Sequence, residues 1–381
     1  MKIFKQRNVY YLNLKKRILA GYTEVHIQRK LKENKILFRS NCLNIQSINI
    51  ICSENIPLQP NYTIKGQPST KSFADGFEVI LPDNYKFSTC ILRIVFERET
   101  EKSMNNNYNP GIIFYDPINL QDEHREMIIE DSAYGCPYID QVTNVEMIYV
   151  LPNSRNIELT SSGKFISFSE TSNSLIYIYE AKNINPNQLC FALGTYQSKS
   201  ILDEENVYLP SSLNLTIDEF ISDTQNILKY YNMYSELTPP SIVFSLCPVK
   251  ILTGKNLIIM NISYLGRPKD IELNFRLKEI ICELLAEQMF MFFNHTLVDT
   301  WIFQGFTGYL TDMGLRFLLG HNEFLYRYKR DRDYCVDNDI IEPPLFYSER
   351  VKEEYKSKFF KLKSKLVFHT IHNQFSGAFV I

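Results

Sequence analysis

Three glutamates recur at intervals of four residues in a segment with a helical pattern. Glu279, Glu283 and Glu287 would share one face of that helix, where neighbouring like charges repel by roughly a few tenths of a kcal/mol. A hard cation held by the three carboxylates could relieve the repulsion, but a solvated acidic ridge is the more common arrangement. We therefore expect no metal site at these glutamates.

The remaining candidate metal ligands are histidines and cysteines. His369 and His372 lie three residues apart on a predicted helix, but the pair lacks a third ligand, so a surface or half-packed position is expected. The eight cysteines include no C-x-x-C pair, which argues against a zinc knuckle or a redox motif. We expect reduced, mostly packed thiols and no cofactor.

Basic residues with interleaved tyrosines suggest contact with nucleic acid. Arg327, Lys329, Arg330 and Arg332 lie in YRYKRDRDY, and a lysine-rich stretch covers residues 356–365. Such clusters can neutralise phosphates while the aromatic rings pack or stack. Acidic residues interrupt the first cluster and precede the second, as on a solvated helix of mixed charge. Direct DNA contact is therefore a hypothesis with a strong competing explanation.

Length and composition indicate the framework that must position these residues. The chain has 381 residues, 45% hydrophobic and 22% charged, which favours two folded domains. A net charge of -2 provides no general attraction to nucleic acid or anionic lipid. The basic N-terminus lacks an apolar h-region, and no run of about 18 apolar residues occurs. We expect a soluble, non-secreted protein without membrane contact.

The residue pattern changes near the middle of the chain. Up to about residue 185, short β-branched and aromatic runs alternate with polar clusters, which predicts an antiparallel β domain over residues 1–186. Beyond the loop at 183–188, helical spacing predominates, with a few strand-like segments, and predicts an α+β domain over 187–381. Helices are expected over 217–234, 272–294, 308–320 and 348–375. The apolar stripe of the second comprises Leu273, Leu277, Ile280, Leu284 and Leu285.

Residues 281–310, ICELLAEQMFMFFNHTLVDTWIFQGFTGYL, resemble the zinc-site helices of the M1 aminopeptidases. There, HExxHQWFG supplies two histidine ligands and the general base, and WxNEGFA supplies a glutamate as third ligand. Here Glu283 and Glu287 occupy the histidine positions and Leu284 that of the base. Gln304 occupies the position of the third ligand. The shared Ala, Gln, Phe, Trp, Gly and Phe residues are those that pack the two helices.

Other peptidase motifs are also altered. The segment expected to contain G-x-M-E-N reads ILTGKNLIIMN at residues 251–261, without a glutamate, and a later tyrosine of the family falls at Lys361. The resemblance implies a saddle-type antiparallel β domain followed by a thermolysin-like α+β domain with a degenerate zinc site. It implies no catalytic residues, no metal, no small-molecule substrate and no enzyme activity.

Several segments, taken in order, resemble one branch of this superfamily, the TBP-associated factor two family of the general transcription factor TFIID. The most specific segment, WIFQGFTGYLTDMGLRFLLGHNEFLYRYKRD, covers residues 301–331. The other segments are RILAGYTEVHI (17–27), CPYID (136–140), LCFALGTY (189–196) and VYLPSSLN (207–214).

This resemblance implies a nuclear, non-catalytic scaffold of the RNA polymerase II pre-initiation complex. Its partners would be TBP, other TBP-associated subunits and, as a further contact, core-promoter DNA. Members of the branch continue into a long helical-repeat region, whereas this sequence ends at AFVI, so it is either a reduced member or a fragment. The alternatives are a zinc aminopeptidase and a peptidase-fold scaffold outside transcription.

Overall fold

The structure, a computed structural model, groups by contact into two units, each assembled from several segments. The first comprises Met1–Lys199, Asn206–Asn214 and Ser241–Ile262, and the second Ser200–Glu205, Leu215–Pro240 and Ser263–Ile381. The predicted boundary between residues 186 and 187 separates domains defined by resemblance to the M1 aminopeptidases. The two contact-based units do not test it, so it stays a prediction. The described residues are 2–14, 16–28, 35–41, 43–51, 57–58, 61–65, 76–80, 89–99, 108–109, 111–115, 125–129, 135–141, 143–153, 157–202, 205–213, 215–234, 238–266, 270–290, 299–345 and 357–375.

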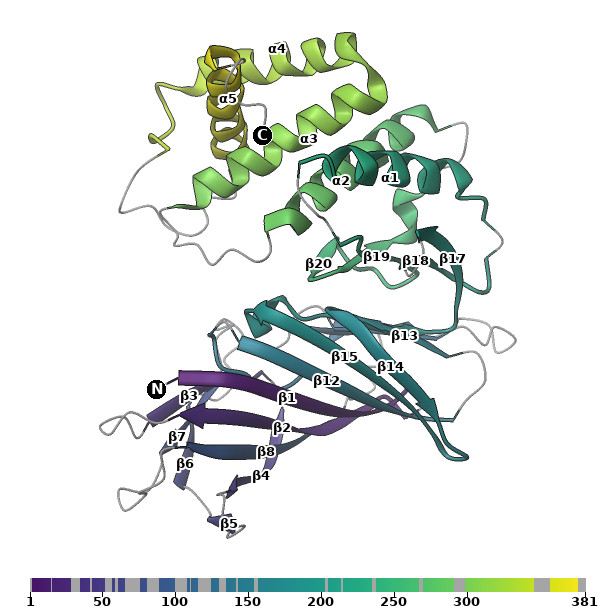
Figure 1. Cartoon of the computed structure of the whole chain (residues 1–381), viewed down its shortest axis with the longest axis vertical. Helices are drawn as coiled ribbons and strands as arrows, with labels where there is room; N and C mark the ends of the chain where they lie inside the picture. The colour runs from purple at the N-terminus through teal and green to yellow at the C-terminus, as the bar shows by residue number, and fades with distance from the viewer. Residues whose placement is uncertain are drawn as a thin grey trace. The chain divides into compact units, whose positions relative to one another are not determined.

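An eight-stranded sheet forms much of the first unit (Figure 1). Its side chains alternate between the two faces, so that Val145, Met147 and Tyr149 of β12 are buried while their neighbours are more exposed. Adjacent strands are antiparallel, as predicted, except that β1 and β12 pair in parallel. The spatial order is β14 (Lys164–Glu170), β15 (Ser174–Ile184), β12 (Thr143–Pro152), β1 (Lys2–Asn13), β2 (Ile18–Gln28), β8 (Thr89–Glu99), β4 (Asn44–Ile51) and β5 (Pro57–Leu58).

A second sheet closes the main core of this unit. Tyr10 of β1 stacks on Tyr149 with ring centroids 4.9 Å apart, and Phe191 of the second sheet lies 5.0 Å from Tyr149. Such aromatic pairs contribute about 0.5–1.5 kcal/mol beyond the area they bury, so they help to hold the two sheets together. The strands are β13 (Glu158–Ser161), β16 (Phe191–Gly194), β11 (Glu126–Ile129), β10 (Ile112–Tyr115) and β9 (Tyr108–Asn109).

Two smaller sheets contain the remaining strands of the described chain. In one, Phe38 stacks on Phe77 at 5.2 Å and both join a core with Val25 and Leu92 of the large sheet. The other is mixed, because β19 runs parallel to β18 and β21 while β20 is antiparallel. The first consists of β3 (Lys35–Arg39), β7 (Gly76–Ile80) and β6 (Asn61–Lys65), and the second of β17 (Tyr196–Leu202), β18 (Glu205–Pro210), β19 (Ser241–Ser245), β21 (Leu257–Asn261) and β20 (Leu252–Gly254).

The α-helices of the described chain lie in the second unit and pack around α3, which contacts each of the others (Figure 1). None of them is long and apolar enough to cross a membrane. Gly320, at φ +91°, ends α3 and lets α4 begin at once in a new direction. The helices are α1 (Asp218–Tyr231), α2 (Ile271–Phe290), α3 (Thr300–Leu319), α4 (His321–Asn338) and α5 (Lys358–Gln374).

The helix predictions are largely confirmed, with two corrections. The segment after Gly320 forms a helix of its own, α4, where no separate helix was assigned. In α2, Leu277, Leu284 and Leu285 are buried as expected, but Leu273 is 42% exposed, so its place in the apolar stripe was wrong. The buried residues of α2 begin at Leu277, one turn later than expected. Residues 291–294 and 348–356 of two predicted helices lie outside the described residues.

Candidate active-site helices and basic cluster

The α2–α3 pair carries the positions at which the M1 resemblance requires a zinc site. Tyr231 of α1 fixes this pair, because its hydroxyl donates to the carbonyl oxygens of Cys282 at 3.2 Å and of Leu310 at 3.0 Å. Gly314 of α3 makes room for the phenol, since a Cβ there would lie 2.6 Å from the Tyr231 hydroxyl. The buried phenol thus ties three helices together at the level of the altered motif.

Within this frame, Leu284, at the position of the general base, is 5% exposed and belongs to the buried face of α2. Glu283 and Glu287 on the same helix are partly exposed. The Gln304 side-chain oxygen on α3 is buried and has no hydrogen-bond partner among the described residues. Across the part of the chain that the structure describes, no three His, Cys, Asp or Glu residues gather closely enough to hold a metal ion.

Basic side chains from neighbouring helices meet the glutamates of α2. Arg327 of α4 lies 3.0 Å from Glu279, and Lys361 of α5 lies 3.9 Å from Glu283. Both glutamates are about two-fifths exposed, so each pair contributes at most about 1 kcal/mol. The ridge is therefore compensated by the chain's own cations. Lys361, at the position of the family's tyrosine, lies beside Glu283, at the position of its first histidine.

A buried charge cluster on α3, α4 and α5 was missed by the sequence analysis. The Lys365 ammonium donates to Asp312 at 3.0 Å and lies 2.8 Å from Asp331, while His369 Nε2 bonds to the other oxygen of Asp312 at 2.8 Å. All four residues are buried, with exposed fractions of 9% or less. The expectation of a surface or half-packed His369 was wrong for this residue; His372 is half-buried and shares a 3.0 Å hydrogen bond with Tyr309.

Electrostatics account for the ionised state of this cluster. Burial alone would raise the pKa of Asp312, but the charge of Lys365 and the hydrogen bond with His369 outweigh it, so that pKa lies below its ordinary value. Burial likewise opposes the charge on Lys365, yet Asp312 and Asp331 raise its pKa. Because each polar group is committed to another and buried, the cluster suits a tie between helices rather than a site open to substrate.

The sequence held one signal for this cluster. Lys365 and His369 are four residues apart and therefore on one face of α5. Their partner Asp312 lies in the apolar run GYLTDMGL, where an unpaired carboxylate would be costly. Rings of Tyr309, Tyr328 and Phe324 surround the imidazole at 5.0, 5.3 and 5.6 Å.

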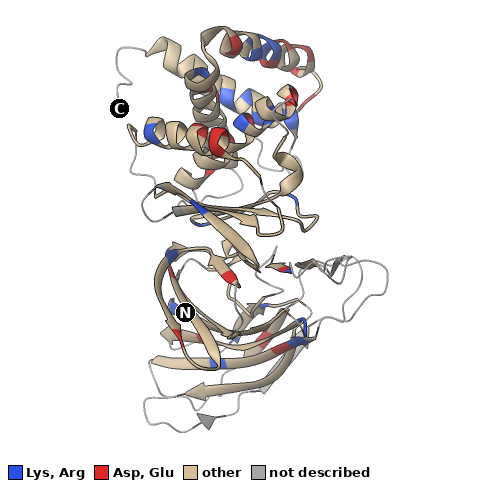
Figure 2. Cartoon of the chain, turned by 90° about the vertical axis from the view of Figure 1, so that its right-hand side faces the viewer, with Lys and Arg blue, Asp and Glu red and all other residues tan. Residues whose placement is uncertain are grey.

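The four residues of the basic cluster lie on α4 but differ in their surroundings. Arg327 is 13% exposed and is held by Glu323 at 2.7 Å as well as by Glu279. Arg330 and Arg332 are about half exposed, and each pairs with the aspartate that follows it. Lys329 is exposed. Figure 2 shows acidic and basic residues interleaved along the helices. By its exposure and its partners, Arg327 serves the interior of the unit, whereas the other three basic residues are exposed.

The lysine-rich stretch at 356–365 is divided in the same way. Lys365 belongs to the buried cluster, Lys363 pairs with Asp339, and Lys358 lies 4.2 Å from the ring centre of Tyr334. Lys356 lies outside the described residues. Little of this stretch is therefore available as a continuous phosphate-binding surface.

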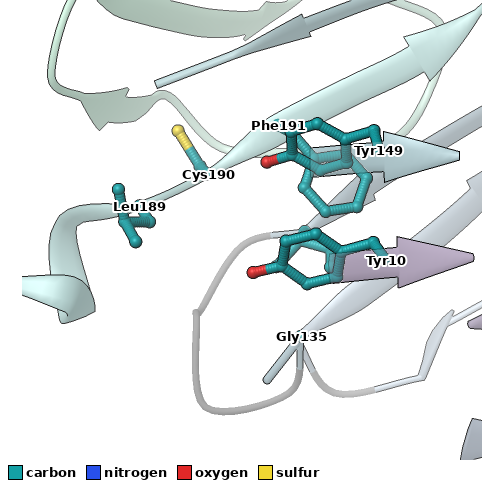
Figure 3. A pocket seen from close by; sticks show the side chains of 7 residues that line it. Tyr10, Gly135, Tyr149, Leu189, Cys190 and Phe191 are labelled. Carbon is teal, nitrogen blue, oxygen red and sulfur yellow. The ribbon is translucent and has the colours of Figure 1, made fainter. Parts of the chain in front are cut away.

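The first unit holds a small cavity between its two main sheets (Figure 3). Tyr10, Tyr149 and Phe191 line it, together with Cys190, and its volume is about 10 Å³. That volume accommodates at most one water molecule, so the cavity is not a substrate site. Burial raises the pKa of the Cys190 thiol to about 11, which keeps it protonated and unreactive at neutral pH.

The cysteines agree with the sequence prediction where they can be seen. Within the described ranges, each cysteine is buried and outside any disulfide. Cys42 and Cys52 lie outside the described residues.

The peptidase-motif segment at 251–261 forms the β20–β21 hairpin, whose strand β21 is almost entirely buried.

Comparisons with known proteins support the fold. Neither a protein-family model nor a curated protein sequence matches the chain. Two solved structures of yeast LTA4 hydrolase, one native and one in complex with bestatin, match 97% of this chain with TM-scores of 0.72 and 0.71 at 12% sequence identity. The chain spans 59% of the length of each. The predicted M1 aminopeptidase-like fold, a β region followed by an α+β region, is confirmed.

Proposed function

We propose that this chain is a peptidase-fold scaffold without peptidase activity. The observation that carries the proposal is the burial of Leu284, which is 5% exposed at the position of the general base. Glu283 and Glu287 replace the two imidazoles, and Gln304 offers a neutral amide in place of the third ligand. An M1 zinc centre needs imidazoles and a base at these positions, because the metal must be held while a bound water is deprotonated.

The second candidate is a zinc aminopeptidase, and the fold shared with LTA4 hydrolase favours it. The purified chain is expected to contain no stoichiometric zinc and to leave amino-acid anilides intact. Metal analysis and an anilide assay check this. Stoichiometric zinc that disappears together with activity in Glu287→Ala would overturn the scaffold proposal.

A restored site provides the matched control. The triple variant Glu283→His, Glu287→His, Gln304→Glu recreates the three M1 ligands on α2 and α3 and is expected to bind one zinc ion. Failure of this variant to bind zinc while it remains folded would show that the motif positions are misassigned.

The finer proposal places this scaffold in TFIID, in the role of the TBP-associated factor two subunit. It rests on the branch-specific segments, above all residues 301–331, since a fold alone does not determine function. The partners would be TBP and other TBP-associated subunits in the nucleus. Affinity purification of the tagged chain from its native cell should recover TBP and histone-fold subunits. Their reproducible absence would favour a scaffold outside transcription.

Contact with core-promoter DNA is part of the same proposal. It predicts different effects for the exposed residues of the basic cluster and for the less exposed Arg327. Replacing Lys329, Arg330 and Arg332 together by alanine should reduce the dependence of log affinity on log salt by about three. Arg327→Ala alone should leave the salt dependence unchanged, because this guanidinium is 13% exposed and bound by two carboxylates. Titration of the chain with duplex DNA at several salt concentrations measures both. An unchanged slope in the triple variant would remove the cluster from the DNA contact.

A further inference from the structure

Strand β14 is the outermost strand of the eight-stranded sheet and has an unusual surface. Of the described residues, only those of β15 pair with it along the sheet. All seven of its residues are exposed, including the large apolar side chains of Phe165 at 49%, Ile166 at 50% and Phe168 at 47%. Edge strands of soluble proteins are normally protected by charge, proline or a covering element, because their free backbone groups can pair with another strand.

The exposed rings continue the core face of the sheet to its edge. Phe165 lies opposite Tyr179 of β15 and Phe168 opposite Tyr177, with ring centroids 5.4 and 4.9 Å apart. Both tyrosines belong to the main core of the unit. A further strand beside β14 would therefore extend an existing apolar layer.

The sequence of β14, KFISFSE, is complementary to itself when reversed. Lys164 begins it, Glu170 ends it, and Ser167 lies at its centre. A bulge shifts the register between Phe165 and Ser167, which leaves Ile166 without a partner on β15. Reversal about Ser167 sets Ile166 against Phe168, Phe165 against Ser169 and Lys164 against Glu170.

We propose that β14 pairs antiparallel with β14 of a second copy of this chain, about a two-fold axis at Ser167. The pairing places Ser167 opposite Ser167 of the second copy and Ile166 opposite its Phe168. The Lys164 end of each strand lies beside the Glu170 end of the other, so opposite charges meet at both ends. A two-fold interface requires such self-complementarity, and this is the reason to assign a second copy rather than an unrelated protein.

The hydrogen bond that Glu170 already makes leaves it able to pair with Lys164 of the second copy. Asn153 donates to Glu170 at 3.1 Å, in an exposed hydrogen bond at the hairpin end. That bond uses one carboxylate oxygen, so the other can accept from a lysine of the second copy.

A cysteine placed on the proposed axis tests the geometry. Ser167→Cys should give a disulfide-linked dimer under mild oxidation that a reductant reverses, because directly opposed residues in antiparallel strands have Cβ atoms about 4.5–5.5 Å apart. The matched control is Ser169→Cys on the same strand. Its copies would lie about 13 Å apart across the axis, beyond disulfide reach, so it should form no disulfide-linked dimer, like the wild type. Equal cross-linking of the two variants, or none in Ser167→Cys, contradicts the proposed axis.

Charge exchange tests the pairing without a cross-link. Lys164→Glu and Glu170→Lys each set like charges against each other at both ends and should raise the dimer dissociation constant about tenfold in sedimentation experiments. The double exchange restores opposite charges and should return the constant to the wild-type value. A wild-type chain that stays monomeric at its highest soluble concentration, or a double variant as weak as the single ones, overturns the proposal. Neither measurement depends on zinc, peptidase activity or TFIID.

Discussion

Replacing Lys365 by methionine is expected to lower the free energy of unfolding by about 3–5 kcal/mol. The lysine is 9% exposed and is shared by Asp312 at 3.0 Å and Asp331 at 2.8 Å. Methionine fills much of the same volume but leaves two buried carboxylates facing each other without their cation. Urea denaturation of the full chain measures the loss.

The control for this variant is Lys361→Met, one turn earlier on α5. Lys361 is 51% exposed and lies 3.9 Å from Glu283, so its replacement should change the free energy of unfolding by no more than about 0.5–1 kcal/mol. Equal losses in the two variants would mean that the buried cluster does not stabilise the helical unit.

The pH dependence of the Lys365→Met defect gives a second check. In the wild type, the pKa of Asp312 is lowered, so its carboxylate stabilises the fold above its ordinary pKa of 3.8, and this contribution is lost as the pH falls through the lower folded value. Without Lys365, burial raises that pKa instead, and protonation favours the folded state. The stability difference between variant and wild type should therefore be largest near neutral pH and shrink towards pH 4.

Leu284→Ala is expected to lower the free energy of unfolding by about 2–5 kcal/mol. Leu284 is 5% exposed on the face of α2 that also buries Leu285 and Ile281, so truncation removes buried methyl groups and leaves a cavity. Urea denaturation measures this loss as well. The result also tests whether a residue at a catalytic position of the peptidases has become part of the core.

The matched control is Leu273→Ala, on the same helix and with the same chemical change. Leu273 is 42% exposed, so its truncation should stay within about 0.5 kcal/mol. A loss at Leu273 as large as that at Leu284 would mean that the two ends of α2 are equally packed, contrary to the structure.

Much of the fold can be predicted from local patterns. The runs at 23–27, 91–96, 145–151 and 175–179 lie within strands of the large sheet, and the run at 9–14 extends one residue beyond β1, because alternation of apolar residues commits one face to the interior. The parallel pairing of β1 with β12 had no such signal. It joins segments more than a hundred residues apart, and hydrophobic alternation does not encode which strand becomes the neighbour.

The candidate site, like the fold, could be predicted only in part. Residue identities come from the local sequence, whereas the partners of each side chain depend on contacts between distant segments. The resemblance sets Glu283 and Glu287 at the histidine positions and Leu284 at that of the base, and this prediction depends on residue identity alone. Where each glutamate finds its counter-charge depends on how α4 and α5 cross α2. Arg327 was therefore grouped with an exposed basic cluster, whereas packing directs it to Glu279 and Glu323.

By itself, the sequence determined which residues stand at the α2–α3 positions, and the absence of imidazoles there is the basis for predicting that no M1 zinc centre forms. Only the tertiary structure decided which ionisable groups are removed from water. Asp312, Asp331, Lys365 and His369 come from three helices, and each looks like an ordinary polar residue in its own segment. Their burial is tolerated because packing of α3, α4 and α5 sets opposite charges about 3 Å apart, a distance that no local pattern specifies.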